Sequence, residues 1–297
     1  MEQIMKLAIC ITTRNRPQEL NTCLEAIWSS TVKPHSVIVS DDSAENEVRE
    51  KNRQIVSQYP NTTYLLGSRL GVCANRNNAV NAVADADLVA FVDDDICIEP
   101  DFTAVAAASY KQMSRTTCNY TILTGSSRDR YDREIFPGKL TFRGYFKSTE
   151  SPESVVIHAA VFPRAFFKDE QWDENIFFGY EDAELCLRAL KRGYRVVYVP
   201  ELRARDTGSA KGTLNVPSIG NLTDYEIYTE AARLYVGIKR YKNLFPDPIR
   251  LLLFISVYFV HMTLYLLKRR SLGGLAEIVR RSQIERLWKP FKLFIPT

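Results

Sequence analysis

Histidine is scarce in this sequence: the three histidines among its 297 residues, His35, His158 and His261, stand far apart. Such spacing supports neither a zinc site nor a Ser/His/Asp triad. Both common nucleotide-binding motifs are also missing, namely G-x-x-x-x-G-K-[ST] and a G-x-G-x-x-G segment after the first apolar stretch. The six cysteines show no metal-ligand spacing, which favours reduced thiols in a cytosolic compartment. Any nucleotide bound here must therefore be held by side chains outside these motifs.

The sequence up to Val92 alternates strand-like and helix-like segments. The strand-like segments are Leu7–Ile11, Val37–Val39, Tyr64–Leu66 and Leu88–Val92. Alternation of this kind predicts an α/β fold in which helices cover a parallel sheet. Polar residues follow all four segments, and the carboxyl ends of such strands form the edge at which α/β proteins bind ligands. Four polar clusters on one edge predict a binding site, although any one of them alone would be an ordinary loop.

Three consecutive aspartates, Asp93, Asp94 and Asp95, follow the fourth apolar segment. Their charges repel one another unless a cation lies between them. Asp93 and Asp95 are two residues apart and point the same way in an extended segment. Two convergent carboxylates suit a Mg²⁺ or Mn²⁺ ion that also holds a diphosphate. On the triple aspartate alone, a solvated acidic turn is an equally good interpretation.

The other polar clusters favour the metal-diphosphate interpretation. They supply three arginines that suit a negatively charged ligand, Arg14, Arg69 and Arg76, and a carboxylate that suits a hydrogen-bonding ring, Asp41. A nucleoside diphosphate with a bound metal meets all of these demands.

These segments resemble the nucleotide-sugar half of the family 2 glycosyltransferases. The resemblance rests on Thr12-Thr13-Arg14-Asn15-Arg16-Pro17, Asp41-Asp42-Ser43, Ala74-Asn75-Arg76-Asn77, the triple aspartate, and Trp172 to Arg188 with its Glu181-Asp182 pair. It covers roughly residues 6 to 210 and is closest in kind to bacterial rhamnosyl- and galactofuranosyl-type transferases of surface glycan assembly. It implies a GT-A fold, a Rossmann-like mixed sheet with covering helices, here followed by a C-terminal helical extension.

The resemblance also implies roles for the donor-side residues. Asp93 and Asp95 are similar to the family's DxD pair, with Asp95 the more direct metal ligand and Asp93 near the ribose or the metal. Asp94 between them is expected on the donor side. The remaining donor-binding residues implied are Thr12 and Arg14 beside the base, Asp41 on the base, Arg76, and Arg69 at a position where many relatives have asparagine.

Asp182 is similar to the second residue of the family's "ED" motif, the proposed general base, and Glu181 is expected to support it. A positioned carboxylate can take the proton that an attacking hydroxyl loses. The alternative is structural, since acidic residues are favoured in the first turn of a helix. After Val199-Pro200 the family often carries a metal-site histidine, and this chain has none. Asp206 stands near that place, either as a metal ligand or as a loop residue paired with an arginine.

The C-terminal part differs from the rest in charge and hydropathy. From Arg233 onward there are 13 Lys or Arg against 3 Asp or Glu, or +10, although the whole chain carries only +4. Leu251–Leu267 is almost entirely apolar and is followed by Lys268, Arg269 and Arg270. This run could span a bilayer, lie in its interface or pack in an oligomer. Leu275–Phe294 is basic and amphipathic, with Trp288 and Phe291 as interfacial anchors. A core helix with a solvated basic face is the alternative.

The sequence thus predicts a catalytic domain at 1–230, with a nucleotide-binding half at 1–97 and an acceptor half at 98–230, and a membrane-associating region at 231–297. The predicted activity is inverting, Mn²⁺- or Mg²⁺-dependent sugar transfer from a nucleotide-diphosphate donor to a lipid-linked or polymeric glycan. The predicted location is the cytoplasmic face of the cell membrane, on an anionic surface, with a homo-oligomer through the C-terminal region as an option and no nucleic-acid partner. The alternatives are a sugar nucleotidyltransferase and a non-catalytic relative that binds sugar nucleotides.

Overall fold

The computed structural model describes residues 5–208 and 220–288 and contains two compact units. Unit 1 comprises Met1–Leu140, Phe146–Glu174 and Glu181–Thr213. Unit 2 comprises Thr141–Tyr145, Asn175–Tyr180 and Leu214–Thr297. The sequence-based domain boundaries stay a prediction.

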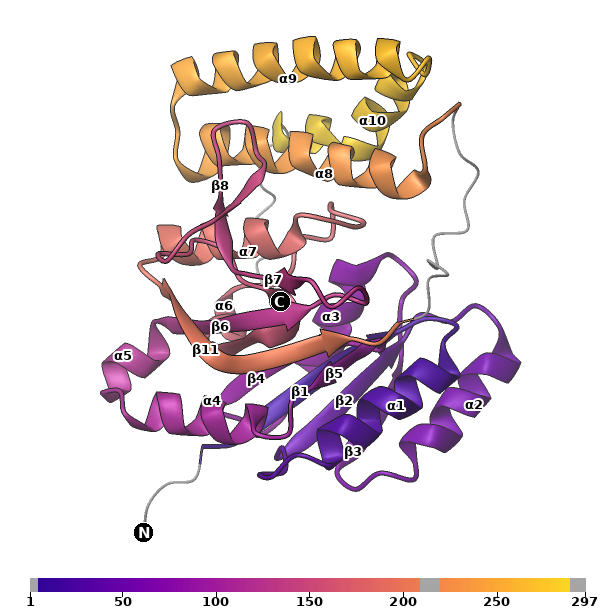
Figure 1. The fold of residues 1–297 in the computed structure, drawn as a ribbon, viewed down its shortest axis with the longest axis vertical. Helices are drawn as coiled ribbons and strands as arrows, with labels where there is room; N and C mark the ends of the chain where they lie inside the picture. Colours follow the sequence, from indigo (N-terminus) through magenta and orange to yellow (C-terminus); the bar gives the residue numbers. More distant parts are fainter. Residues whose placement is uncertain (1–4, 209–219, 289–297) are drawn as a thin grey trace, which may run out of the picture. The chain divides into compact units, whose positions relative to one another are not determined.

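The main sheet of unit 1 is mixed and has the order β3-β2-β1-β4-β10-β6-β11-β5, with β7 paired to β6 (Figure 1). Strands β3, β2, β1 and β4 are parallel, as the sequence predicts. β10 is antiparallel to both β4 and β6. The strands are β1 (Leu7–Thr13), β2 (Ser36–Asp41), β3 (Thr62–Leu66), β4 (Leu88–Asp93), β5 (Ile96–Ile98), β6 (Thr121–Arg128), β7 (Glu134–Ile135), β10 (Ala160–Pro163) and β11 (Arg195–Asp206). A separate small sheet pairs β8 (Gly138–Leu140) with β9 (Phe146–Ser148).

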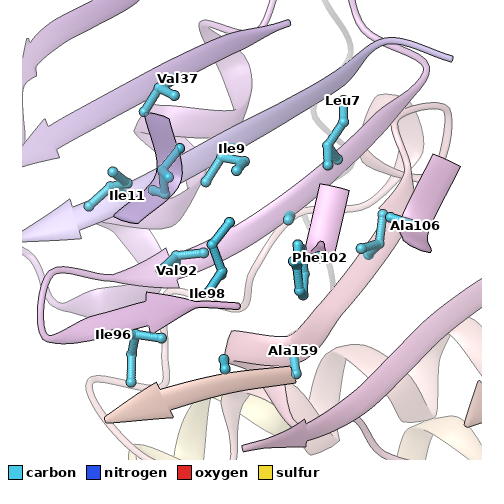
Figure 2. Close-up of a cluster of buried hydrophobic side chains, with 14 of the residues drawn as sticks. Leu7, Ile9, Ile11, Val37, Val92, Ile96, Ile98, Phe102, Ala106 and Ala159 are labelled. Carbon is cyan, nitrogen blue, oxygen red and sulfur yellow. The ribbon is translucent and has the colours of Figure 1, made fainter. Parts of the chain in front are cut away.

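The hydrophobic core of unit 1 lies on both faces of the central strands. Every residue of β1 is buried, as expected of a parallel strand covered on two sides. Figure 2 shows Ile9 and Ile11 of β1 and Val92 of β4 in one apolar cluster with Phe102. The helices of unit 1 are α1 (Pro17–Trp28), α2 (Asn46–Val56), α3 (Val72–Asn81), α4 (Phe102–Lys111), α5 (Arg115–Asn119), α6 (Phe166–Asp169) and α7 (Glu181–Lys191), with the 3₁₀ turn η1 (Ile157–Ala159).

The described part of unit 2 from Asp224 onward is mainly helical. It contains α8 (Asp224–Lys239), the π-helical turn η2 (Arg240–Leu244), α9 (Pro248–Lys268), α10 (Gly274–Ser282) and the 3₁₀ turn η3 (Ile284–Trp288). Thr223 and Glu226 form a capping box at the start of α8, which satisfies two backbone donors. Asp247 caps α9 by accepting a hydrogen bond from the Arg250 backbone at 2.9 Å.

The predicted amphipathic segment Leu275–Phe294 is interrupted. Helix α10 ends at Ser282, and Gln283 adopts a left-handed conformation with φ 51°. A left-handed residue is a common way for a helix to end, and η3 follows in place of a continuous helix. Phe291 lies outside the described residues. The apolar run Leu251–Leu267 falls inside α9, the one helix in the described residues that is long and apolar enough to cross a membrane.

Candidate functional site

The carboxyl ends of β1, β2 and β4 bring the predicted donor-side residues together. Thr12 lies opposite Asp93 across the β1–β4 pair, and Thr13 lies opposite Asp41 across the β1–β2 pair. Thr12 Oγ1 donates a hydrogen bond to Asp93 Oδ1 at 2.9 Å. The sequence-based expectation that these polar clusters share one sheet edge is therefore confirmed.

Arg76 of α3 forms the buried centre of this edge, with 2% of its surface exposed. Its Nη2 lies 3.2 Å from Asp93 Oδ1 and its Nη1 lies 3.0 Å from Glu181 Oε1. Its guanidinium also stacks on the Trp172 ring at 4.8 Å. Burial raises the pKa of Asp93, but the charges of Arg76 and His158 and the hydrogen bonds from Thr12 and Arg76 together outweigh it and lower that pKa to about 2. Arg76 thus joins the triple aspartate to the Glu181-Asp182 pair through one charge.

Asp94 and Asp95 share a different arginine. The Arg16 Nη1 donates to Asp94 Oδ1 at 3.1 Å and also to Asp95 Oδ2. Asp94 further accepts a hydrogen bond from Thr13 Oγ1 at 2.7 Å. Burial raises the pKa of Asp94 to about 7 against the opposing Arg16 charge. Asp94 therefore fixes the loop after β1, and its predicted contact with the donor stays a prediction.

Asp95 and Asp206 border one small space. Asp206 ends β11 and lies opposite Ile96 of β5, so the β11–β5 pairing carries it to the triple aspartate. A Cβ atom at Gly208 would lie 2.9 Å from Asp95 Oδ2 and 3.1 Å from Asp206 Oδ1. A side chain at Gly208 would therefore crowd both carboxylates. Asp95 Oδ2 already accepts a hydrogen bond from Arg16, and Asp206 Oδ1 accepts one from the Gly208 backbone at 2.8 Å.

The chemistry of these two ligands suits Mg²⁺ or Mn²⁺. Within residues 5–208 and 220–288, no three His, Cys, Asp or Glu side chains already surround one point. The remaining ligands would come from the donor diphosphate and water, as is usual for Mg²⁺. Burial and the charge of Asp93 raise the pKa of Asp95, and a cation at this place would offset both effects.

Asp41 is held firmly beside this edge. Its Oδ1 accepts from the Ser43 backbone at 2.7 Å, and its Oδ2 accepts from Asn52 Nδ2 at 2.9 Å and from the Tyr64 hydroxyl at 2.8 Å. A carboxylate offers about four lone-pair sites, so these bonds fix its orientation and leave little capacity for a ligand. The role of Asp41 in binding the base stays a prediction. The base would have to donate to the lone pair that these three hydrogen bonds leave unused.

Two of the predicted donor-binding arginines, Arg14 and Arg69, are exposed. The Arg69 backbone donates to Asp42 Oδ1 at 2.9 Å, and Arg69 adopts a left-handed conformation with φ 60°. A Cβ atom at Gly67 would lie 2.0 Å from Asp42 Oδ1, so only glycine fits beneath this carboxylate. The loop after β3 is thereby tied to β2, with both guanidinium groups accessible to an anionic ligand.

Glu181 and Asp182 open α7, whose first turn is strongly acidic. Asp182 Oδ1 accepts from the Ala183 backbone at 2.7 Å, which fits a helix start. Burial and the charge of Glu181 raise the pKa of Asp182 to about 7. Glu181 Oε2 and Arg76 Nε are buried without a hydrogen-bond partner among the described residues. Buried polar atoms without a partner favour a ligand or water that completes their hydrogen bonds.

Sequence reasoning missed His158. Its Nε2 lies 3.7 Å from Asp93 Oδ2. His158 belongs to η1, immediately before β10, and β10 runs antiparallel to β4 with Val161 opposite Ala90. The residues that precede β10 therefore lie beside the end of β4. A single histidine far from any motif carries no spacing signal, so only the strand pairing could have found it.

The chain matches the family model described as Glycosyltransferase like family 2 over residues 5–216, and it therefore belongs to this family. Its fold is GT-A. A crystal structure of S. aureus TarS 1–349 in complex with UDP-GlcNAc is similar, with a TM-score of 0.59 at 17% identity over 95% of this chain and 83% of that chain. GalNAc-T7 with UDP, GalNAc and Mn²⁺ is similar with a TM-score of 0.60 at 13% identity over 80% of this chain. This chain spans 52% of that structure, about half its length. A search of the curated proteins finds no match.

Proposed function

We propose that this chain transfers a sugar, with inversion, from a nucleotide-diphosphate donor to a hydroxyl of a lipid-linked or polymeric glycan in cell-surface polysaccharide synthesis. One observation carries the proposal. Asp182 has a pKa of about 7, and its neighbour Glu181 is linked by buried Arg76 to Asp93 of the triple aspartate. A carboxylate poised near neutral pH is what a general base requires.

In the proposed reaction Asp182 takes the proton of the acceptor hydroxyl as that oxygen bonds to the anomeric carbon. The bond from the anomeric carbon to the diphosphate oxygen breaks, and its electron pair leaves with the diphosphate. Glu181 supports the base through its charge, which contributes to the raised pKa of Asp182. A single base without a nucleophile on the opposite side gives inverted anomeric configuration.

The same proposal assigns the metal to Asp95 and Asp206, with Asp93 beside it. Bound Mn²⁺ or Mg²⁺ would supply Lewis acidity toward the departing diphosphate. Both carboxylates lie close to the same point beside Gly208, which supports this assignment. The usual family histidine after Val199-Pro200 is then replaced by a carboxylate of similar hardness.

For the donor, we assign the base to the loop around Thr12, Arg14 and Asp41, and the phosphates to Arg14 and Arg69. We assign Arg76 an indirect role, because it is buried and its charge favours the ionised form of Asp93. The structures named above carry UDP-GlcNAc in TarS and UDP with GalNAc in GalNAc-T7, which makes UDP-sugars the first donors to test.

The acceptor and location are part of the proposal. We place the protein at the cytoplasmic face of a membrane, with the catalytic domain at 1–230 and the membrane-associating region at 231–297. The sugar nucleotidyltransferase alternative loses support because the matched family is one of glycosyltransferases. The non-catalytic alternative loses support because Asp93, Asp95 and Asp182 are all present at one sheet edge and its adjoining helix.

The testing experiment measures release of nucleoside diphosphate from a panel of nucleotide-sugars, with Mn²⁺, Mg²⁺ or a chelator, and identifies the product by NMR. We expect metal-dependent release and, with a competent acceptor, an anomeric configuration opposite to that of the donor. Pyrophosphate release would instead indicate a nucleotidyltransferase. Activity that survives excess chelator would remove the metal from the proposal, and a retained configuration would remove Asp182 as a simple base.

A further inference from the structure

Helix α9 has two apolar faces, of which the described part of unit 2 covers one. The inner face is formed by Phe254, Tyr258, Met262 and Leu266, which are buried at a spacing of four residues. Tyr258 donates from its hydroxyl to the backbone oxygen of Glu230 on α8 at 2.9 Å, which fixes this face against α8. Tyr265 also reaches α8, because its hydroxyl donates to Glu226 Oε1 at 3.2 Å. The exposed positions of α9 lie on the side away from these contacts.

The opposite face of α9 is exposed and mostly apolar from one end of the helix to the other. Its exposed fractions reach 72% at Ile249 and 63% at Val260, and we call this face the outer stripe; its residues are Ile249, Leu252, Leu253, Val257, Val260, Leu264 and Leu267. Leu251–Leu267 contains no charged residue. In Figure 1, α9 runs beside α8 and α10 at the edge of the helical group. Ser256 is the exposed polar residue within this face, and it carries no charge. A largely apolar, uncharged patch of this length on a surface marks an interaction site.

The charges at the ends of the outer stripe point to one kind of partner. Arg250 lies at its start, and Lys268 and Arg270 lie at its end, all exposed. We propose that the outer stripe lies in the interface of an anionic lipid bilayer, with α9 parallel to the surface and Lys268 and Arg270 among the headgroups. An apolar helix face bordered by basic residues is the pattern of interfacial helices.

The inner face of α9 excludes a spanning arrangement of this fold. Beneath it lies Arg233, 2% exposed, paired with Glu230 at 2.6 Å and stacked on the Tyr258 ring at 4.5 Å. Surrounding α9 with lipid would strip Tyr258 from α8 and uncover this ion pair in hydrocarbon, where charged groups are costly. One buried face and one exposed apolar face fit a helix that lies on the membrane.

Charge also favours lipid over a second copy of the chain. Two parallel outer stripes would place Lys268 and Arg270 beside their own copies, and two antiparallel stripes would place them beside Arg250. Asp247, three residues before Arg250, caps α9 and also pairs with the Arg250 side chain at 3.4 Å, so this carboxylate is already engaged by its own helix. Like charges at close range oppose such pairing, whereas an anionic leaflet attracts all three.

The test is cosedimentation of the full chain with vesicles of phosphatidylcholine alone or mixed with phosphatidylglycerol. We expect binding to both and tighter binding to the anionic vesicles. The pair Leu253→Asp and Val260→Asp should weaken binding to both by at least about tenfold, because charge enters the apolar interface. Lys268→Gln with Arg270→Gln should weaken anionic binding on the order of tenfold and leave neutral binding unchanged. Val32→Asp is the matched control, because Val32 is 48% exposed in unit 1 and lies outside the stripe.

Both stripe residues are exposed, so the variants should keep the wild-type circular dichroism and thermal unfolding, which separates a binding defect from unfolding. Donor hydrolysis should also stay at the wild-type level, and its failure in every chain would concern the donor site and not this proposal. Three results would overturn the interfacial assignment. They are absence of vesicle binding, a lipid-free dimer that Val260→Asp converts to a monomer, and retention of the chain in membranes after an alkaline carbonate wash.

Discussion

Arg76 Nη2 lies 3.2 Å from Asp93 Oδ1 at a point where the arginine is almost fully removed from solvent. This pair joins helix α3 to the end of strand β4, and the same guanidinium reaches Glu181 at the start of α7. A buried ion pair is weak evidence for stability, but removing one partner leaves an uncompensated charge. The relationship therefore predicts a large effect on folding as well as on catalysis.

Arg76→Gln should destabilise the chain by about 3–5 kcal/mol, because Asp93 and Glu181 would lose their shared cation in a buried setting. Urea unfolding followed by circular dichroism measures this. The control Arg53→Gln removes a half-exposed arginine 3.8 Å from Glu50 and should change stability by less than about 0.5 kcal/mol. Adding Glu181→Gln to Arg76→Gln should recover part of the loss. If Arg76→Gln is as stable as the control Arg53→Gln, the ion pairs of Arg76 with Asp93 and Glu181 do not contribute to folding.

Asp182→Asn should lower kcat by on the order of a hundredfold or more while donor affinity stays nearly constant, as expected when a general base is lost. Donor affinity is measured by calorimetry with the nucleotide-sugar, and kcat by diphosphate release. The variant should also unfold at higher temperature at pH 8, because it removes a buried charge. If donor binding falls and turnover per bound donor survives, Asp182 is a structural residue of α7.

The pH dependence follows from the raised pKa of Asp182, about 7. The base is active when deprotonated, so kcat should fall about tenfold per pH unit below that value and level off above it. Stability has the opposite slope. Between an unfolded pKa of about 3.9 and the folded value the native state binds more protons, so this carboxyl lowers stability as pH rises. The measurement is kcat at about five pH values between pH 5 and pH 8. A kcat that does not change over this range would reject Asp182 as the titrating base.

Measurements of metal binding should distinguish the contributions of Asp95 and Asp206. Asp95→Asn should abolish Mn²⁺ binding measured by calorimetry with UDP present, and Asp206→Asn should weaken it by about tenfold, since each removes one hard oxygen ligand. Asp85→Asn is the control, because this exposed carboxylate pairs with Lys6 and precedes the start of β4, whereas the triple aspartate lies at the end of that strand. If Asp206→Asn binds Mn²⁺ as the wild type does, Asp206 is a loop residue and not a ligand.

The sequence predicted what local patterns encode. The first four strands, their parallel order and the polar residues at their carboxyl ends all appear as expected, because apolar runs and their endings are short-range signals. The contacts of Arg76 with Glu181 and of Arg16 with Asp94 join residues far apart in the chain and could not be read from spacing. His158 reaches Asp93 only because β10 turns back against β4. The basic, amphipathic segment expected from Leu275 is helical in its described part but is interrupted at Gln283, whose left-handed backbone no periodicity reveals.

The Arg16 guanidinium donates hydrogen bonds to Asp94 and Asp95 and so balances their negative charge at the predicted metal position. A metal ion that binds there would replace the Arg16 guanidinium and would not meet two unpaired carboxylates. The displaced Arg16 guanidinium would then be available to an anion, and in the proposed reaction that anion is the donor diphosphate. By linkage, whatever factor the diphosphate adds to metal affinity the metal adds to diphosphate affinity. The chain would thus hold metal weakly alone and firmly only together with its donor.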